Sequence, residues 1–508
     1  MQTRMTFNLK RLSIICFFTA LAGILSYYIF IIDGHGHIDA LGEGLYYYMN
    51  ADWATMCGRW GVRYLLSFFG NIVIPGINVA IYVMCVAISC YLLAELYKID
   101  SVLLQVIMAM AFISSPTICC QLVFAYLVPV YAFSLLLSVF SVYYFRFEGI
   151  KYTIISSIFI FFMMGLYQPY LGMALGTYFV LMVLDFIDEK NIGSIFIQFF
   201  KFILAMLVGC GLDIIVYKME MHYRALQEGS RVAQFSISGI LLSLGSSIIE
   251  IYGDFAHYFW NGKLNLRYYY LFLFIVLLVF AIKCEIRLFR RSKIAAICAT
   301  VVILALPAAM GVIKILIPYN GISSIMHFQY ILVIPLAFSL FTRVNNQLFD
   351  KYIYYLLTIV TSLIVFSCVI INDASFMCQR ISYRAIEKQC DIIIKDAMEI
   401  EGYVRNNTPI ILVGAPDDSQ VVSRLPIYEY SLLPRPIIYN NMAGINDVKF
   451  NYFIDYYGVY TGKIFTDEYK EFVLSDEFYN MPVWPTHGSV VMNDGVIFVK
   501  LTTAPYVP

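Results

Sequence analysis

Long runs of apolar residues, separated by short polar segments, occupy the first three-quarters of the chain. Six runs are long, at residues 12–32, 81–97, 122–145, 195–217, 294–318 and 352–371. Five more are shorter, at residues 102–118, 154–168, 170–187, 268–282 and 325–341. A helix needs about 20 predominantly apolar residues to cross the hydrocarbon core of a bilayer. The pattern therefore predicts a mainly α-helical, polytopic membrane bundle with about 11 spans.

The basic residues predict how this bundle is oriented. Beginning with Arg4, Lys10 and Arg11, alternate short loops carry Lys or Arg, most densely at residues 283–293. The short loops on the other side, such as 167–169, have neither residue. An excess of Lys and Arg marks the cytoplasmic side of a membrane protein. We therefore expect a cytoplasmic N-terminus and, after an odd number of spans, an extracytoplasmic C-terminal segment.

Three predicted outer segments are long enough to carry chemistry. Residues 1–372 form the predicted membrane domain, with an outer catalytic loop at 33–71 and a second outer loop at 218–267. Within the second loop, residues 237–251 are apolar but interrupted by Ser and Gly, which favours a helix lying in the membrane interface. Residues 373–508 form a predicted extracytoplasmic domain.

The composition of this C-terminal segment indicates a small α/β domain. Residues 382–405 have the pattern of an amphipathic helix, and residues 409–414 form an apolar run ending in Gly, typical of a buried strand. Residues 489–492 and 496–501 flank Asn493-Asp494-Gly495, which is a hairpin signal.

The overall composition agrees with a membrane protein. Hydrophobic residues make up 61% of the chain and charged residues 13%, against about 25% charged in a soluble domain. The net charge of +0 gives no basis for binding nucleic acid. His35 and His37 are a possible metal pair, but no further ligands accompany them, so a metal is not indicated and no cofactor is expected.

Carboxylates in the first outer loop are the strongest candidates for catalysis. Asp39 and Glu43 are four residues apart and share one face if this segment is helical. An ionised carboxylate there can take a proton from a hydroxyl nucleophile. Alternatively, Asp39 caps the N-terminus of an interfacial helix. Both interpretations stay open, as does the choice between the two acids as base.

Several basic and polar side chains are candidates for binding an anionic substrate. Arg59 and Arg63 lie four residues apart, a spacing that suits a phosphate group as well as contact with lipid headgroups. Lys314, near the outer end of its span, has the same two interpretations, and His327 either lines the same cavity or is a core histidine. Asp213, deep in a span, is expected to pair within the protein.

Short motifs along the chain resemble one family. They are Tyr46-Tyr47-Tyr48, Trp53, Gly58-Arg59-Trp60, Ser114-Ser115-Pro116 and Gly165-Leu166-Tyr167-Gln168-Pro169-Tyr170, together with an acid soon after the first span and a polar helix after the last. This set is similar to the bacterial serotype-converting O-antigen membrane glucosyltransferases. The resemblance covers nearly the full chain.

The resemblance implies a multi-pass enzyme of the bacterial plasma membrane with a GT-C architecture. It implies a transfer of a hexose, expected to be glucose, from a polyprenyl-phosphate donor to a cell-surface polysaccharide or its lipid-linked precursor on the outer face. Asp39 and Glu43 are the expected catalytic residues. The expected substrate-binding residues are Asp52, Arg59, Tyr167, Gln168, Lys314 and His327. A flippase of lipid-linked sugar and a glycan polymerase or ligase of similar topology are the alternatives.

Overall fold

The computed structural model describes residues 8–34, 48, 51–227, 237–260, 262–317, 324–343, 350–405, 407–414, 426–433 and 470–501. The chain divides into two compact units. The first comprises Met1–Tyr28, Tyr48–Leu122 and Leu127–Asn372, and the second comprises Ile29–Tyr47, Val123–Tyr126 and Asp373–Pro508.

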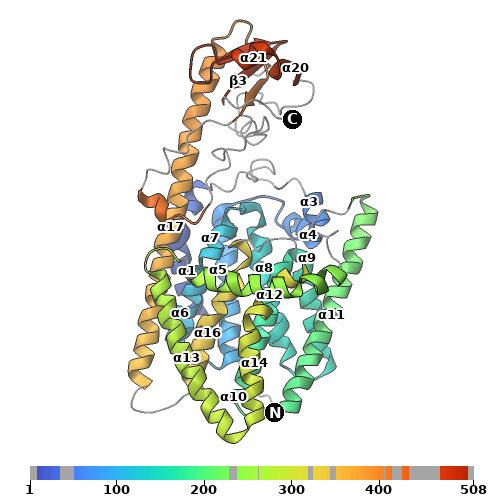
Figure 1. The fold of residues 1–508 in the computed structure, drawn as a ribbon, viewed down its shortest axis with the longest axis vertical. Helices are drawn as coiled ribbons and strands as arrows, with labels where there is room; N and C mark the ends of the chain where they lie inside the picture. The colour runs from blue at the N-terminus through green and yellow to red at the C-terminus, as the bar shows by residue number, and fades with distance from the viewer. Residues whose placement is uncertain are drawn as a thin grey trace. The chain divides into compact units, whose positions relative to one another are not determined.

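The first unit is helical throughout its described residues (Figure 1). Its helices are α1 (Leu9–Asp33, of which the last turn belongs to the second unit), α3 (Ala51–Met56), α4 (Gly61–Phe68), α5 (Pro75–Tyr97), α6 (Val102–Ile113), α7 (Pro116–Leu122), η1 (Ala125–Leu127, mostly in the second unit), α8 (Val128–Phe145), α9 (Ile150–Tyr167), η2 (Gln168–Tyr170), α10 (Leu171–Ile187), α11 (Ile192–Tyr223), α12 (Ile237–Trp260), α13 (Leu266–Arg291), α14 (Lys293–Met310), α15 (Val312–Leu316), η3 (Ser324–Met326), η4 (Phe328–Leu332), α16 (Val333–Arg343) and the first half of α17 (Asp350–Met398).

The length and composition of these helices make the protein a membrane protein. Among the described residues, seven helical segments are long and apolar enough to cross a bilayer, or eight if the bent pair α6 and α7 is one span. Large apolar side chains remain exposed on them, for example Phe200, Leu204 and Leu207 of α11, as expected of a surface that faces lipid. The count of eleven spans stays a prediction, since several predicted spans form shorter helices.

One of the seven segments, Ile150–Ile187, reverses direction in its middle. Arg146, just before α9, forms an ion pair of 2.7 Å with Asp185 at the far end of α10. The start of α9 and the end of α10 therefore lie at the same side of the bundle. The chain turns back at η2, where Pro169 lacks the N–H that a continuous helix requires.

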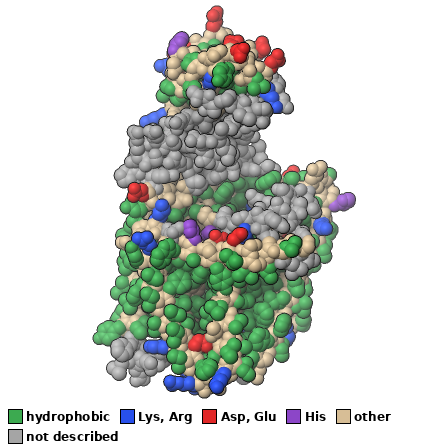
Figure 2. All heavy atoms as spheres, viewed as in Figure 1, with side chains coloured by type: hydrophobic (Ala, Val, Ile, Leu, Met, Phe, Trp, Pro, Cys, Tyr) green, Lys and Arg blue, Asp and Glu red, His purple; other side chains and the backbone are tan. Residues whose placement is uncertain are grey.

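The same end of the bundle collects the basic residues that the sequence assigned to the cytoplasm. Asp188 accepts hydrogen bonds from Arg343 at 2.7 Å and from Lys98 at 2.8 Å, and Lys190 also pairs with Asp185. Lys and Arg side chains gather at the lower end of the bundle in Figure 2, where Figure 1 labels α10. The predicted alternation of basic and uncharged loops thus corresponds to two distinct ends of one bundle.

Helix α12 lies across the bundle. In Figure 1 it runs nearly horizontally, whereas α11, α13 and α14 run close to vertical, and it contacts α13, α14 and α15. Tyr258, near its C-terminal end, hydrogen bonds to Ser115 at 3.4 Å, between α6 and α7. The segment predicted to lie in the interface is therefore a helix of 24 residues placed across the spans, at the end opposite to the basic loops.

A polar contact fixes α17 against the first helices. Pro116 disfavours helical geometry in the residue before it, so α6 and α7 meet at a bend of 42°. The bend frees the carbonyl oxygen of Ser114, which accepts a 2.8 Å hydrogen bond from Asn372 Nδ2. Tyr27 of α1 donates to the neighbouring carbonyl of Ile113 at 2.6 Å. Three helices are thereby joined by side-chain to backbone bonds in the interior.

The second unit contains the remainder of α17. The amphipathic helix predicted at residues 382–405 is part of α17, which continues from Asp350 without interruption and ends at Met398. The change from apolar to polar side chains ends the membrane pattern but leaves helix formation unaffected, since no Gly or Pro occurs before Gly402. Arg380 forms an ion pair of 3.1 Å with Asp33 at the end of α1.

A three-stranded sheet follows, with the order β1-β3-β2. The strands are β1 (Ile410–Val413), β2 (Val490–Asn493) and β3 (Val496–Lys500), accompanied by η5 (Pro426–Tyr430), α20 (Lys470–Val473) and α21 (Asp476–Asn480). Strands β2 and β3 are antiparallel, and β1 is parallel to β3. The predicted strand and the predicted hairpin are confirmed; Asp494 and Gly495 have positive φ angles of 48° and 74°, as the turn requires.

The two ion pairs of Asp185 yield a stability prediction. Replacing Asp185 with Asn removes the negative charge between Arg146 and Lys190, so we expect a loss of about 1–3 kcal/mol and a lower thermal inactivation temperature in detergent. Asp100→Asn is the matched control, because the exposed Asp100 at the same end has no ion pair among the described residues. Equal melting temperatures for the two variants would contradict the assignment.

Candidate functional site

The Gly58-Arg59-Trp60 motif lies between α3 and α4 and is anchored in the bundle by its Trp. Trp60 is buried, and its Nε1 donates a 2.7 Å hydrogen bond to Asp213 Oδ1 on α11. This bond satisfies a carboxylate that would be costly in the membrane interior without a partner. The prediction that Asp213 pairs within the protein is therefore confirmed, and its partner is the Trp of the motif.

Two glycines permit a close approach between this motif and α9. A Cβ atom on Gly165 would lie 2.5 Å from Trp60 Cε2, and a Cβ atom on Gly61 would lie 3.0 Å from the carbonyl oxygen of Gly165. The indole ring thus lies directly on the backbone of α9, two residues before that helix ends at Tyr167. The Gly58-Arg59-Trp60 motif and the motif that begins at Gly165 are therefore packed against each other.

The end of α9 presents an aromatic ring to Arg59. Tyr167 leaves the helix with extended backbone angles, φ −155° and ψ 98°, and the Arg59 guanidinium carbon lies 4.8 Å from the centroid of its ring. The next residue, Gln168, donates a 2.6 Å hydrogen bond from Nε2 to the carbonyl oxygen of Gly58. One backbone bond and one cation–π contact therefore hold the arginine in place.

Arg59 retains an unused donor. Its Nε is buried and has no hydrogen-bond partner among the residues that the structure describes. The Nε of the nearby Arg63 also has no partner among the described residues, but one of its terminal nitrogens bonds to Asp52, so those two charges compensate each other. Arg59 is thus the cation of this group that is ready to bind an anion, and a guanidinium suits the paired oxygens of a phosphate.

Behind Tyr167, buried polar side chains connect η2 to neighbouring helices. The hydroxyl groups of Tyr82 and Tyr170 are 3.0 Å apart, and both bond to Gln121. Gln121 Nε2 in turn donates to the carbonyl of Ile325 at 2.7 Å. This network fixes η2 and η3 relative to each other, so the loop that carries Arg59 rests on a rigid base.

Lys314 lies in a second group of charges, between α15 and α12. Its side chain is only 5% exposed and forms an ion pair of 2.5 Å with Glu250. One turn further along α12, burial raises the pKa of Asp254, and the Lys314 charge opposes that shift. Helix α15 also contacts η2, so Lys314 belongs to an element that packs against the Arg59 group. Figure 2 shows His and acidic side chains along the band that α12 occupies.

His327 lies among aromatic rings of η4 and α12. It stacks on Tyr330 with ring centroids 5.3 Å apart and meets Tyr258 edge-on at 5.8 Å. Burial, with a smaller contribution from the His257 charge, lowers the pKa of His327 to about 4, so the ring is neutral at pH 7. Its Nε2 and the Tyr330 hydroxyl have no hydrogen-bond partner within the described residues.

The structure brings some of the predicted site residues together and not others. Arg59, Tyr167 and Gln168 are in direct contact or adjacent. Asp52 bonds to Arg63 instead of Arg59, and Lys314 and His327 each contact residues of α12. Asp39 and Glu43 lie outside the described residues.

The prediction from the sequence did not include the titratable residues of α12. Glu250, Asp254 and His257 recur at intervals of four and three residues, which places them on one face of an interfacial helix. That spacing was the available signal. Among the described residues, no group of three His, Cys, Asp or Glu could hold a metal ion.

Comparison with known proteins gives one match. The model of the family described as Glucosyl transferase GtrII matches residues 38–334, which is more than half of the 508 residues. The matched range contains all the predicted catalytic and substrate-binding residues, from Asp39 to His327. Searches of curated proteins and of solved structures found no match.

The packing of Trp60 on Gly165 can be tested directly. In Gly165→Ala the new methyl group meets the indole ring at a distance that real contacts do not show, so we expect a destabilisation of about 1–3 kcal/mol from overpacking. The matched control is Gly211→Ala in α11, where a Cβ atom meets nothing within 4 Å. Thermal unfolding should distinguish them; a Gly165 variant as stable as the control would refute the contact.

Proposed function

Because the chain belongs to the Glucosyl transferase GtrII family and is therefore a membrane-embedded glycosyltransferase, we propose that it moves a hexose from a polyprenyl-phosphate donor. Glucose is the proposed sugar. The acceptor is a cell-surface polysaccharide or its lipid-linked precursor. The reaction takes place on the outer face of a bacterial plasma membrane, within a GT-C architecture.

The proposed reaction needs a base and a group that stabilises the departing phosphate. A hydroxyl oxygen of the acceptor attacks the anomeric carbon of the donor sugar, and the bond from that carbon to the phosphate oxygen breaks. Polyprenyl phosphate leaves with the electron pair, and the hydroxyl proton passes to a carboxylate. Asp39 or Glu43 of the first outer loop is the proposed base.

The environment of the Arg59 guanidinium is the observation that supports this proposal. Its guanidinium is held over Tyr167, and its Nε has no hydrogen-bond partner among the described residues. A cation that is fixed in advance stabilises the charge that develops on a leaving phosphate without further reorganisation. The arginine lies 20 residues after Asp39 in the same predicted outer loop, so the proposed base and phosphate site share one segment of chain.

The second group of charges has a proposed role in binding the rest of the substrate. Lys314 is already neutralised by Glu250, so it suits a phosphate less well than Arg59 does. Neutral rings such as His327 and Tyr330, with polar atoms lacking partners in the described part of the chain, suit sugar hydroxyl groups, which both donate and accept hydrogen bonds. We assign them to the hexose or the acceptor.

A transfer assay tests the function. Purified protein is incubated with polyprenyl-phosphate glucose and an acceptor glycan, and released polyprenyl phosphate and glucosylated product are both measured. We expect equal amounts of the two. Arg59→Ala should lower kcat about 10²-fold or more, whereas Lys151→Ala, a cation at the opposite end of the bundle, should retain activity. Sugar that crosses vesicle membranes without release of lipid phosphate would identify a flippase instead.

The base is identified by comparing two variants. Asp39→Asn removes the proton acceptor but still caps a helix about as well as Asp does. If Asp39 is the base, this variant should lose about 10²–10⁴-fold in rate, while Glu43→Gln loses less. Activity in the Asp39 variant together with a dead Glu43 variant assigns the base to Glu43, and full activity in both excludes a catalytic role for either acid.

A further inference from the structure

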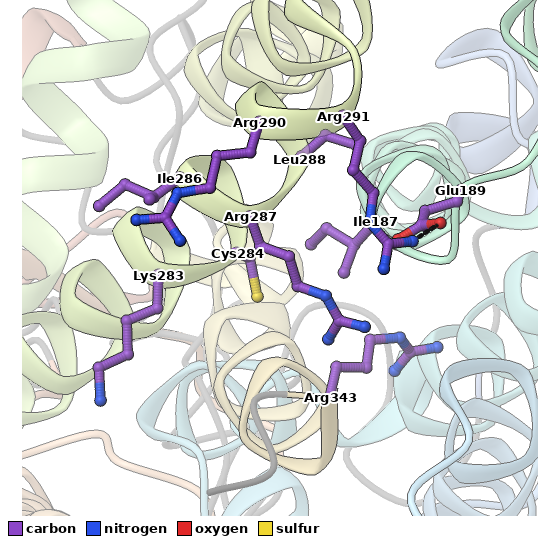
Figure 3. A pocket seen from close by; sticks show the side chains of 10 residues that line it. All are labelled: Ile187, Glu189, Lys283, Cys284, Ile286, Arg287, Leu288, Arg290, Arg291 and Arg343. Carbon is purple, nitrogen blue, oxygen red and sulfur yellow. Dashed lines mark hydrogen bonds and ion pairs between the residues drawn. The ribbon is translucent and has the colours of Figure 1, made fainter.

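A basic pocket lies at the end of the bundle opposite to the proposed catalytic site. It has a volume of about 480 Å³ and is formed by the ends of α10, α13 and α16. Its charged lining consists of Lys283, Arg287, Arg290, Arg291, Arg343 and Glu189 (Figure 3). The volume falls within the range of about 300–1,000 Å³ that is typical of small-molecule sites.

The spacing of the basic residues along α13 creates this pocket. Residues 283, 287 and 291 recur at intervals of four, so they share one face of the helix, and Arg290 directly precedes Arg291. Cys284 and Leu288, one position further on, are buried against the bundle. An excess of positive charge on one side of the membrane accounts for the number of basic residues. That general excess does not explain why arginines from two different helices, α13 and α16, surround one cavity.

The positive charge of the pocket is only partly compensated. Arg343 pairs with Asp188, and it also donates to the carbonyl of Tyr97 at 3.0 Å. Arg291 pairs with Glu189. Lys283, Arg287 and Arg290 form no hydrogen bond or ion pair with any residue in the described ranges. In Figure 3 the Arg287 side chain points toward the side of the pocket where Arg291 and Arg343 lie. Three like charges therefore line one cavity, in which Glu189 is the carboxylate.

The surroundings of the pocket favour a lipid as the source of the missing negative charge. Ile286 lines the pocket and is itself 49% exposed, and its neighbours Ile282 and Phe289 on α13 are 49% and 51% exposed. The cationic cavity therefore adjoins apolar side chains that face the bilayer. A ligand that fits both parts has a phosphate group in the cavity and acyl chains along α13.

From these observations we propose that the pocket binds the phosphate headgroup of an anionic phospholipid. Phosphodiester oxygens would accept hydrogen bonds from Arg287. The positive charge of Arg290, whose side chain points the other way in Figure 3, would add to the attraction of the headgroup, and the acyl chains would cover Ile282, Ile286 and Phe289. Basic pockets between membrane helices bind anionic headgroups by this combination of charge and apolar contact. The proposed site is independent of the glycosyl transfer and lies at the other end of the spans.

Binding of short-chain lipids to the full-length protein tests the site. The purified chain in a non-ionic detergent is titrated with dihexanoyl-phosphatidylglycerol, with dihexanoyl-phosphatidylcholine and with inorganic phosphate, and binding is followed by thermophoresis. We expect saturable binding of the anionic lipid alone. Each cation contributes a factor of about five in affinity near an anionic headgroup. Arg287→Gln should therefore weaken binding about fivefold, and Arg287→Gln with Arg290→Gln about 25-fold.

Two further variants test whether a loss of lipid binding comes from the pocket, from a change in general surface charge or from misfolding. Lys10→Gln with Lys151→Gln removes two exposed charges at the same end of the bundle and should leave the affinity within twofold. Arg287→Lys with Arg290→Lys keeps the charge and should retain most of the binding. Equal losses in both glutamine pairs would overturn the proposal, as would an unchanged affinity in the pocket variant. Inorganic phosphate that binds as tightly as the lipid would also overturn it, since the ligand would then be a free anion.

Discussion

A polar or charged group that enters a membrane interior needs a partner within the protein, and this cost organises the bundle. At the basic end, Asp185 and Asp188 each bond to two cations, so the ends of several helices are tied together. At the other end, Arg59 and His327 retain buried nitrogens without partners among the described residues. Unpaired donors and acceptors of this kind are costly, and the proposed substrate would satisfy them.

The candidate site depends on contacts between segments that are far apart in the chain. Trp60 and Asp213 are 153 residues apart, and Gln168 bonds to a carbonyl 110 residues earlier. These bonds hold the Arg59 loop on the interior of α11 and on η2, at the end of α9. Because helices make the supporting contacts, displacing Arg59 would require these helices to move as well as the loop that carries it.

The sequence allowed the helical class, the hairpin at Asn493-Asp494-Gly495 and the internal pairing of Asp213 to be predicted, because each follows from local pattern or from the cost of burying charge. The partner of Asp213 could not be predicted, since no local pattern links it to Trp60. The continuity of α17 could not be predicted for a related reason. Polarity changes near Asn372, but a change in polarity does not end a helix, and α17 continues to Met398, four residues before Gly402 with its φ of +88°. A role for carboxylates such as Glu250 was not predicted, because the interfacial helix was recognised from the apolar pattern of residues 237–251.

The bond from Asn372 to the freed carbonyl of Ser114 has a mechanical consequence. A helix advances by about 1.5 Å per residue, so sliding α17 along its axis by even one residue would separate this donor from its acceptor. The neighbouring carbonyl, that of Ile113, already accepts a hydrogen bond from Tyr27. Axial sliding of α17 therefore costs a buried hydrogen bond. A tilt or a rotation of the helix about Asn372 keeps that bond and is the movement that this contact favours.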